Sequence, residues 1–178
     1  MAKVNFPLVV LPGFAAALAI GASLVQAASI DPKPAYATPA TQLEASTVAA
    51  TAKAVFARAD LDNDGTLSRE EYVTLAVVAA ELGRLNGFVP VDYSGGVRTA
   101  ALPRGEDWSR SERARVQTAA ERDYTLFAGE DQRLTRDEFV ASRLEALTAA
   151  DLDRNGVLTG AELVRFAAIE ARVPARQS

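Results

Sequence analysis

The residues with the clearest chemical potential lie in one twelve-residue stretch, Asp60–Glu71, which reads DLDNDGTLSREE. Four carboxylates placed this closely repel one another unless a positive charge lies among them. A tightly turning loop directs alternate side chains inward, so their oxygens can converge on one divalent cation. The chemistry expected here is the binding of a hard cation by oxygen ligands. The residues that carry this expectation are Asp60, Asp62, Asp64, Gly65 and Glu71.

The rest of the stretch completes an oxygen cage of about six to eight ligands, the number that calcium prefers. Thr66 offers its backbone carbonyl and Ser68 can hold a bridging water, whereas Glu71 can supply both carboxylate oxygens. Gly65 permits the sharp turn, and Leu67 would anchor the loop to the core. The predicted metal ligands are Asp60, Asp62, Asp64, Thr66, Ser68 and Glu71.

A second stretch, Asp151–Glu162, repeats the pattern as DLDRNGVLTGAE. Solvated acidic turns would also be rich in Asp, Asn and Gly. They would explain neither the terminal glutamate nor the apolar residue at the eighth position. The first stretch holds four ligand carboxylates and the second holds three, so we expect tighter binding in the first. The second set of predicted ligands is Asp151, Asp153, Asn155, Val157 through its carbonyl, Thr159 and Glu162.

Both stretches resemble the calcium-binding loop of the EF-hand family at all its informative positions. Two such loops between amphipathic helices are similar to calmodulin-type proteins, and the resemblance covers residues 42–84 and 110–171. It implies two Ca²⁺ sites and an all-α fold of helix–loop–helix units with very short β contacts between loops.

The short spacing of the loops also resembles bacterial exported EF-hand proteins, some of which bind lanthanides. The lanthanide binders carry proline at the second loop position, where this chain has Leu61 and Leu152. These leucines argue against lanthanide specificity, and binding of a lanthanide is kept as the alternative to calcium.

The segment 127–138 carries only half of the pattern. Its end, LTRDEF from Leu134, parallels LSREEY from Leu67, but its first half lacks the first two aspartates of the pattern and the glycine at the sixth position. We interpret it as a degenerate hand that keeps its packing role without binding metal. The alternative is a plain capping box from Thr135 to Glu138 that opens the next helix.

The spacing between loops restricts how they can pair. Only twelve residues separate Glu138 from Asp151, enough for one helix whose ends lie about 20 Å apart. Segments 127–138 and 151–162 therefore cannot lie side by side. The loop 60–71 is expected to pair with one of them through strand-like contacts.

Hydrophobic periodicity predicts about five helices in an EF-hand domain over residues 41–173. The first helix is expected to open with a capping box, Thr41 to Glu44. Residues 85–108 show no periodicity and predict a long loop. The arginines form no basic block and are interpreted as solvated helix faces. The expected helices run from Thr41 to about Ala59, Tyr72 to Gly83–Gly87, Ser109 to Phe127, Asp137 to Ala150 and Ala161 to Ala171.

The N-terminal residues 1–27 combine a short basic start, an apolar run and small residues before Ala28, as in a cleaved signal peptide. An uncleaved membrane anchor is the alternative. Residues 28–40 contain several prolines and predict a flexible linker. The expected location is therefore periplasmic or secreted, without membrane contact after cleavage.

Composition narrows the function further. The chain has no histidine and no cysteine, which excludes a histidine general base, a thiolate nucleophile and nitrogen- or sulfur-ligated zinc. Without the signal peptide, 18 basic and 23 acidic residues give a net charge of −5, which argues against nucleic acid as a partner.

The expected function is an exported calcium-binding protein, either a sensor or a calcium-stabilised interaction module, whose protein partner the sequence does not name. Acidic residues outside the loops form no recognisable constellation, so we predict no enzyme activity. A calcium-dependent small hydrolase is the alternative, with residues 87–107 as the segment long enough to build a substrate site.

Overall fold

Five α-helices and seven short β-strands make up the described residues, 37–102 and 108–173, of the computed structural model. The mostly helical class expected from the sequence is confirmed. The helices are α2 (Ala45–Ala59), α3 (Arg69–Asn86), α4 (Arg110–Phe127), α5 (Arg136–Ala150) and α6 (Gly160–Glu170). The strands are β1 (Thr38–Pro39), β2 (Gln42–Glu44), β3 (Thr66–Leu67), β4 (Phe88–Asp92), β5 (Arg98–Ala101), β6 (Leu134–Thr135) and β7 (Val157–Thr159).

The expected signal peptide, residues 1–27, and most of the expected linker, 28–40, lie outside the described residues. Among the helices that the structure describes, none is both long enough and apolar enough to cross a membrane.

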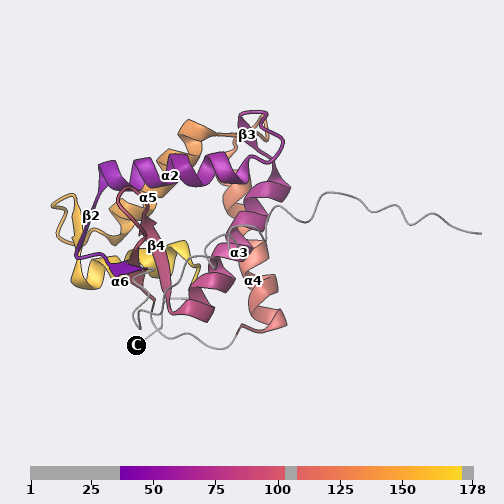
Figure 1. Cartoon of the computed structure of the whole chain (residues 1–178). Helices are drawn as coiled ribbons and strands as arrows, with labels where there is room; N and C mark the ends of the chain where they lie inside the picture. The colour runs from indigo at the N-terminus through magenta and orange to yellow at the C-terminus, as the bar shows by residue number, and fades with distance from the viewer. Residues whose placement is uncertain (1–36, 103–107, 174–178) are drawn as a thin grey trace, which may run out of the picture. The chain divides into compact units, whose positions relative to one another are not determined.

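Helices α2 and α5 pack against each other and run in opposite directions. Each has 15 residues, a length of about 22 Å at the α-helical rise. Strand β2 lies at one end of α2 and β3 at the other (Figure 1). The pair therefore separates two small antiparallel sheets, β2–β7 and β3–β6.

At one end of this pair, the loop 60–71 meets the segment 127–138. Strand β3 pairs antiparallel with β6, with Leu67 opposite Leu134, and both leucines are fully buried. Of the two pairings that the spacing allowed for the loop 60–71, the structure selects this one. The phenol of Tyr124 donates to the carbonyl oxygen of Gln132 at 2.5 Å and also to that of Leu67 at 3.3 Å, so it joins both segments.

At the other end, the loop 151–162 pairs with a strand that the sequence did not indicate. The predicted capping box at Thr41 to Glu44 is wrong, because residues 42–44 form strand β2 and α2 begins at Ala45. Glu44 occupies the N-cap position without a side-chain bond to the helix. Leu43 lies opposite Leu158 and is 2% exposed. Burial of this leucine favours the extended backbone over an earlier start of the helix.

The two ends of the α2–α5 pair are built from the same order of strands and helices. The order strand, helix, strand, helix occurs first as β2–α2–β3–α3 and again as β6–α5–β7–α6. The first strand of each unit pairs with the second strand of the other. Strand β2 therefore pairs with the strand of the second loop as β6 pairs with the strand of the first, and a helix follows each of them. Unlike β6, β2 has no hand-like loop before it in the described part of the chain.

The long loop predicted over residues 85–108 is also wrong in part. Strands β4 and β5 form an antiparallel hairpin, and β1 joins β5 in parallel to complete a three-stranded sheet. Val89 and Val91 are buried on either side of exposed Pro90, an alternation too short to stand out among the flanking glycines and prolines. Helix α3 extends to Asn86 and ends at Gly87, whose φ of +73° favours glycine. Residues 103–107 lie outside the description.

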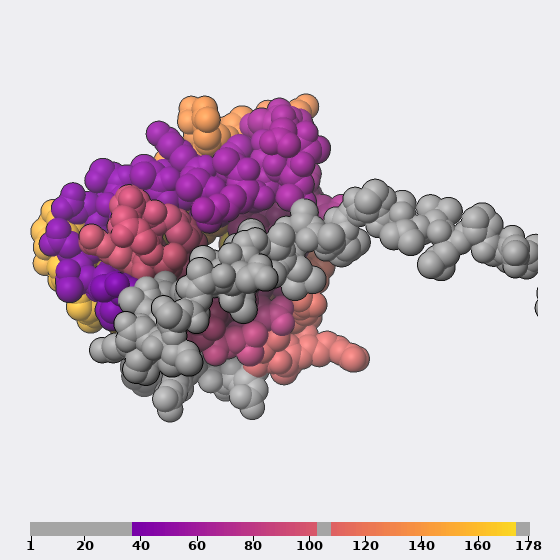
Figure 2. All heavy atoms as spheres, in the orientation of Figure 1, coloured from indigo at the N-terminus to yellow at the C-terminus, as the bar shows by residue number. Residues whose placement is uncertain are grey.

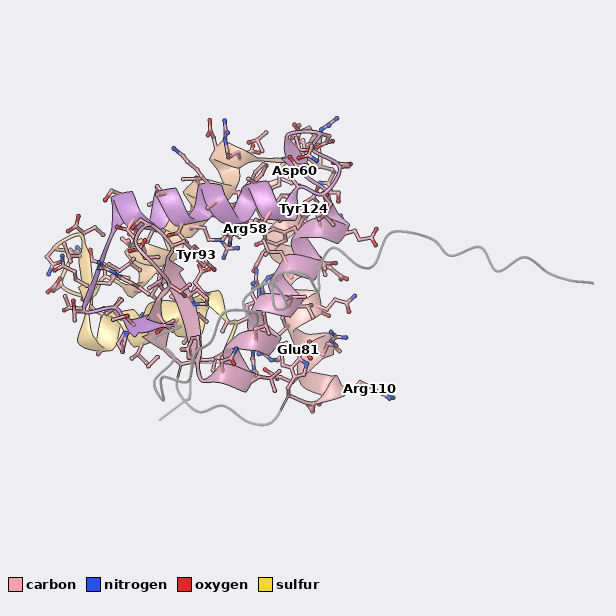
Figure 3. All side chains as sticks on the ribbon, viewed as in Figure 1. Arg58, Asp60, Glu81, Tyr93, Arg110 and Tyr124 are labelled. Carbon is pink, nitrogen blue, oxygen red and sulfur yellow. The ribbon has the colours of Figure 1, made fainter. Side chains whose placement is uncertain are left out.

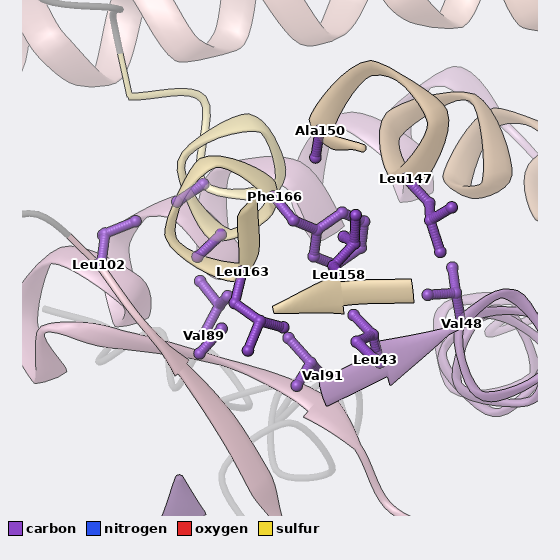
Figure 4. Packing of buried hydrophobic residues seen from close by; sticks show 13 residues of the cluster. Leu43, Val48, Val89, Val91, Leu102, Leu147, Ala150, Leu158, Leu163 and Phe166 are labelled. Carbon is purple, nitrogen blue, oxygen red and sulfur yellow. The ribbon is translucent and has the colours of Figure 1, made fainter. Parts of the chain in front are cut away.

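Two main clusters of buried side chains form the core. One gathers around the β2–β7 pair and includes Leu43, Leu158 and Phe166 (Figure 4). The other lies beneath the β3–β6 pair, where the rings of Phe56 and Phe139 are 5.9 Å apart. Each pair of strands thus rests on its own part of the core.

Replacing Leu43 by alanine should lower the free energy of unfolding by about 2–5 kcal/mol, because a buried cavity would form beside Leu158. Urea denaturation measures this change. Leu85→Ala is the matched control, since Leu85 is 70% exposed and its truncation should change stability by about 0.5 kcal/mol or less. Equal effects of the two substitutions would show that β2 does not hold the second loop.

Candidate metal centres

The loop 60–71 brings three carboxylates to one point. Oxygens of Asp60, Asp62 and Glu71 lie within 4.8 Å of one another. Asp60 directly follows α2, where Figure 3 labels it, and Glu71 stands on the first turn of α3. The loop turns sharply between them, with φ of +57° at Asn63 and +83° at Gly65, a backbone region that glycine enters without steric cost.

Backbone amides of the same loop hold these carboxylates in place. The two oxygens of Asp60 accept bonds from the amides of Asp64 and Gly65, each at 3.1 Å. The oxygens of Glu71 accept from the amides of Leu61 and Ser68, each at 2.8 Å. Amide donors offset part of the repulsion among the acids, and they tie the end of the entering helix to the start of the exit helix.

The same bonds favour the charged form of Glu71. Partial burial alone would raise the pKa of its carboxyl, but bonds from Ser68 and Leu61 outweigh burial and bring the pKa below its ordinary value. Ser68 also donates its hydroxyl to Glu71 at 2.8 Å and completes a capping box at the start of α3. The hydroxyl predicted to hold a bridging water is thus engaged in capping the helix.

Asp64, also a predicted ligand, is not part of the three-carboxylate cluster. One of its oxygens accepts bonds from the amide and hydroxyl of Thr66, at 2.8 and 2.7 Å. The other accepts from the guanidinium of Arg133 at 2.9 Å. Bonds from Thr66, with the nearby charge of Arg133, hold the pKa of the Asp64 carboxyl below its ordinary value. Asp64 is therefore charged and faces the segment 127–138.

The loop 151–162 repeats the arrangement of acids. Oxygens of Asp151, Asp153 and Glu162 lie within 4.8 Å of one another. Asp151 accepts from the amides of Asn155 and Gly156, at 3.2 and 2.9 Å. Glu162 is 8% exposed, so this cluster is more enclosed than a solvated acidic turn would be.

The remaining predicted ligands of this loop lie around the cluster. Glu162 accepts from the amide of Leu152 at 2.9 Å and from that of Thr159 at 3.2 Å. Asn155 donates its side-chain amide to Asp153 at 2.9 Å and accepts from the amide of Val157 at 2.7 Å. Thr159 is the N-cap of α6. The structure therefore places every predicted residue in one hydrogen-bonded loop.

The segment 127–138 keeps the second half of this arrangement. Thr135 and Glu138 form a capping box at the start of α5, as Ser68 and Glu71 do for α3. The capping box is therefore confirmed, and the pairing of β6 with β3 agrees with the packing role of a degenerate hand. Gln132 has a φ of +57° at the place that Gly65 and Gly156 hold in the other loops, so a non-glycine residue takes up the turn at this position.

Several arginines differ from the sequence-based expectation. The side chains of Arg84, Arg143 and Arg172 are only 5, 15 and 10% exposed, so their interpretation as solvated helix faces is wrong. Arg84 donates to Glu112 of α4 at 2.6 Å and to the carbonyl of Ala171 after α6 at 2.8 Å. Such pairing depends on residues far apart in the chain, which no local pattern reveals.

A family comparison agrees with this geometry. The sequence model described as EF hand matches residues 52–76 and 144–167, which contain both acidic clusters. No curated protein and no solved structure shows a significant match to the chain. The two matched segments are EF-hands, the helix–loop–helix units of a calcium-binding family. This chain is therefore a protein with two EF-hands, each carrying an acidic cluster that could hold a metal ion.

Proposed function

We propose that this protein binds two calcium ions, one in each EF-hand, as an exported, calcium-stabilised interaction module. The observation that carries the proposal is the convergence of three carboxylates within 4.8 Å in both loops. Oxygen donors in a flexible, acidic loop fit a calcium ion, whereas magnesium demands a stricter octahedron and zinc prefers nitrogen and sulfur. The absence of histidine and cysteine from the sequence agrees with this choice.

The carboxylates of Asp60, Asp62 and Glu71 would hold the first ion, with Asp64 joining them once released from Arg133. Those of Asp151, Asp153 and Glu162 would hold the second. Calcium would supply positive charge to each cluster and thereby tie an entering helix to its exit helix. Because the clusters lie at opposite ends of the α2–α5 pair, each ion would stabilise a different end of the fold.

A stabilising role for calcium suits an exported protein. The chain contains no cysteine, so no disulfide can cross-link it outside the cytoplasm. Calcium bound to the folded state would replace such cross-links. The signal-like residues 1–27 favour a periplasmic or secreted protein, and the acidic net charge argues against nucleic acid as its partner. Mass spectrometry of the exported protein tests this location, because cleavage after Ala27 leaves Ala28 as the first residue.

Isothermal titration with calcium in a constant background of magnesium is the experiment that tests the function. We expect two sites with dissociation constants of about 10⁻⁷–10⁻⁵ M, the range of regulated EF-hands, and little competition from magnesium. Absence of binding at both loops would contradict the proposal, whereas binding only near millimolar calcium would indicate a purely structural role for the ion. A large change in helical signal or in exposed apolar surface on binding would favour the sensor over the stabilised module.

A further inference from the structure

An arginine from the segment 127–138 reaches into the loop 60–71. The guanidinium of Arg133 lies 2.9 Å from a carboxylate oxygen of Asp64. The pairing of β3 with β6 brings the two segments together, and the side chain of Arg133, which immediately precedes Leu134, reaches back across the first loop to Asp64. Figure 2 shows the loop 60–71 and the orange segment near residue 130 at the same end of the molecule, both on the surface.

Asp64 stands at the fifth position of the loop, where the sequence pattern places a metal ligand. It is nevertheless absent from the cluster that Asp60, Asp62 and Glu71 form. Bonds to Thr66 and Arg133 engage both of its oxygens. A calcium ion that recruits Asp64 as a fourth carboxylate therefore meets the guanidinium of Arg133 as a competing positive charge.

The loop 151–162 offers an internal comparison. Gln42 precedes Leu43 in β2 as Arg133 precedes Leu134 in β6, and Leu43 is the partner of Leu158. Gln42 is uncharged, and its side chain donates to Glu44 at 3.4 Å. The fifth loop position there is Asn155, which is also uncharged. The charged pair of the first loop is thus replaced by two neutral residues in the second.

We propose that Arg133 lowers the calcium affinity of the loop 60–71 by competing with the ion for Asp64. The inference rests on the proposed calcium binding. Four ligand carboxylates less one guanidinium give a charge of −3, and the three carboxylates of the loop 151–162 also give −3. Arg133 therefore offsets the advantage of one carboxylate that the first loop has over the second by ligand count.

The measurement needs the first site in isolation. Glu162→Gln removes a carboxylate of the second cluster, so the titration in this background reports the loop 60–71. Arg133→Gln, which copies the residue found at the corresponding place in β2, should then tighten calcium binding by about three- to tenfold. Affinity equal to that of the parent, or weaker, would overturn the inference.

Arg110→Gln is the control for net charge. Arg110 is exposed at the start of α4, and Figure 3 shows it at the far end from Asp60. Its loss changes the total charge by the same amount and should leave calcium affinity within about twofold, because distant exposed charges are screened. The melting temperature of Arg133→Gln in calcium-free buffer should stay within about 3 °C of the parent, which shows that the fold is intact.

A double-mutant cycle tests whether Arg133 acts through Asp64. In an Asp64→Asn background no carboxylate remains for the arginine to occupy, so Arg133→Gln should change affinity by less than about twofold. A gain as large as in the parent would show a general charge effect and overturn competition for Asp64. If the unsubstituted protein binds no calcium at all, the proposed function fails first, and that outcome is distinct from failure of this inference.

Discussion

Replacement of Glu71 by glutamine should weaken calcium binding at the loop 60–71 by about 100-fold, because calcium affinity in these loops follows the number of ligand charges. The substitution removes one charge from the three-carboxylate cluster. It also removes an acceptor for the backbone amide of Leu61 or Ser68, so a hydrogen bond that holds the loop to the exit helix is lost. Calorimetry should then find one remaining site, with the affinity of the loop 151–162.

The control is Glu70→Gln. Glu70 is the neighbouring residue on the same first turn of α3, is exposed, and lies outside the cluster. The two substitutions remove the same charge from the same turn, so a long-range electrostatic effect would be common to both. Glu70→Gln should leave two sites. If both variants lost a site, or neither did, Glu71 would not be the ligand that closes the first loop.

Removal of calcium should lower the melting temperature by about 20–30 °C. At 1 mM free calcium and a dissociation constant near 1 µM, each site stabilises the native state by about 4 kcal/mol, or about 8 kcal/mol for two. For a domain of this size, about 1 kcal/mol corresponds to about 3 °C. Thermal unfolding followed by circular dichroism, with calcium and then with a chelator, measures the shift.

The double variant Glu71→Gln and Glu162→Gln separates site binding from general effects of the chelator. With each site weakened about 100-fold, 1 mM calcium still contributes about 1.4 kcal/mol per site, so the melting temperature should fall by only about 8 °C on chelation. Magnesium added in place of calcium should restore little of the shift in the unsubstituted protein. A protein that melts at the same temperature with and without calcium would contradict a stabilising role for the ion.

The loops were predictable from the sequence because their determinants are local. Asp60, Gly65 and Glu71 define a turn within twelve residues, and the structure brings acids of both loops together as that pattern implies. The helices α3 to α6 were also predictable, since their apolar periodicity and capping residues are local features.

The features that the sequence did not reveal form mostly between residues that lie far apart along the chain. The short strand β2 forms because Leu43 is buried against Leu158, and nothing within Gln42–Glu44 itself indicates this partner. The hairpin β4–β5 was not predicted because its alternation of buried and exposed residues is brief. The contact between Arg133 and Asp64 requires the register of two strands, which only the folded structure determines.

The pairing of β2 with β7 also governs when the molecule can fold. Leu43 and Leu158 are partners although 115 positions separate them along the chain. Closing so long a loop has a large entropic cost, and contacts of this range slow folding. A polypeptide that crosses a membrane N-terminus first would present β2 early and β7 almost last. The cluster of buried residues around β2 and β7 could then assemble only after the final hand had emerged.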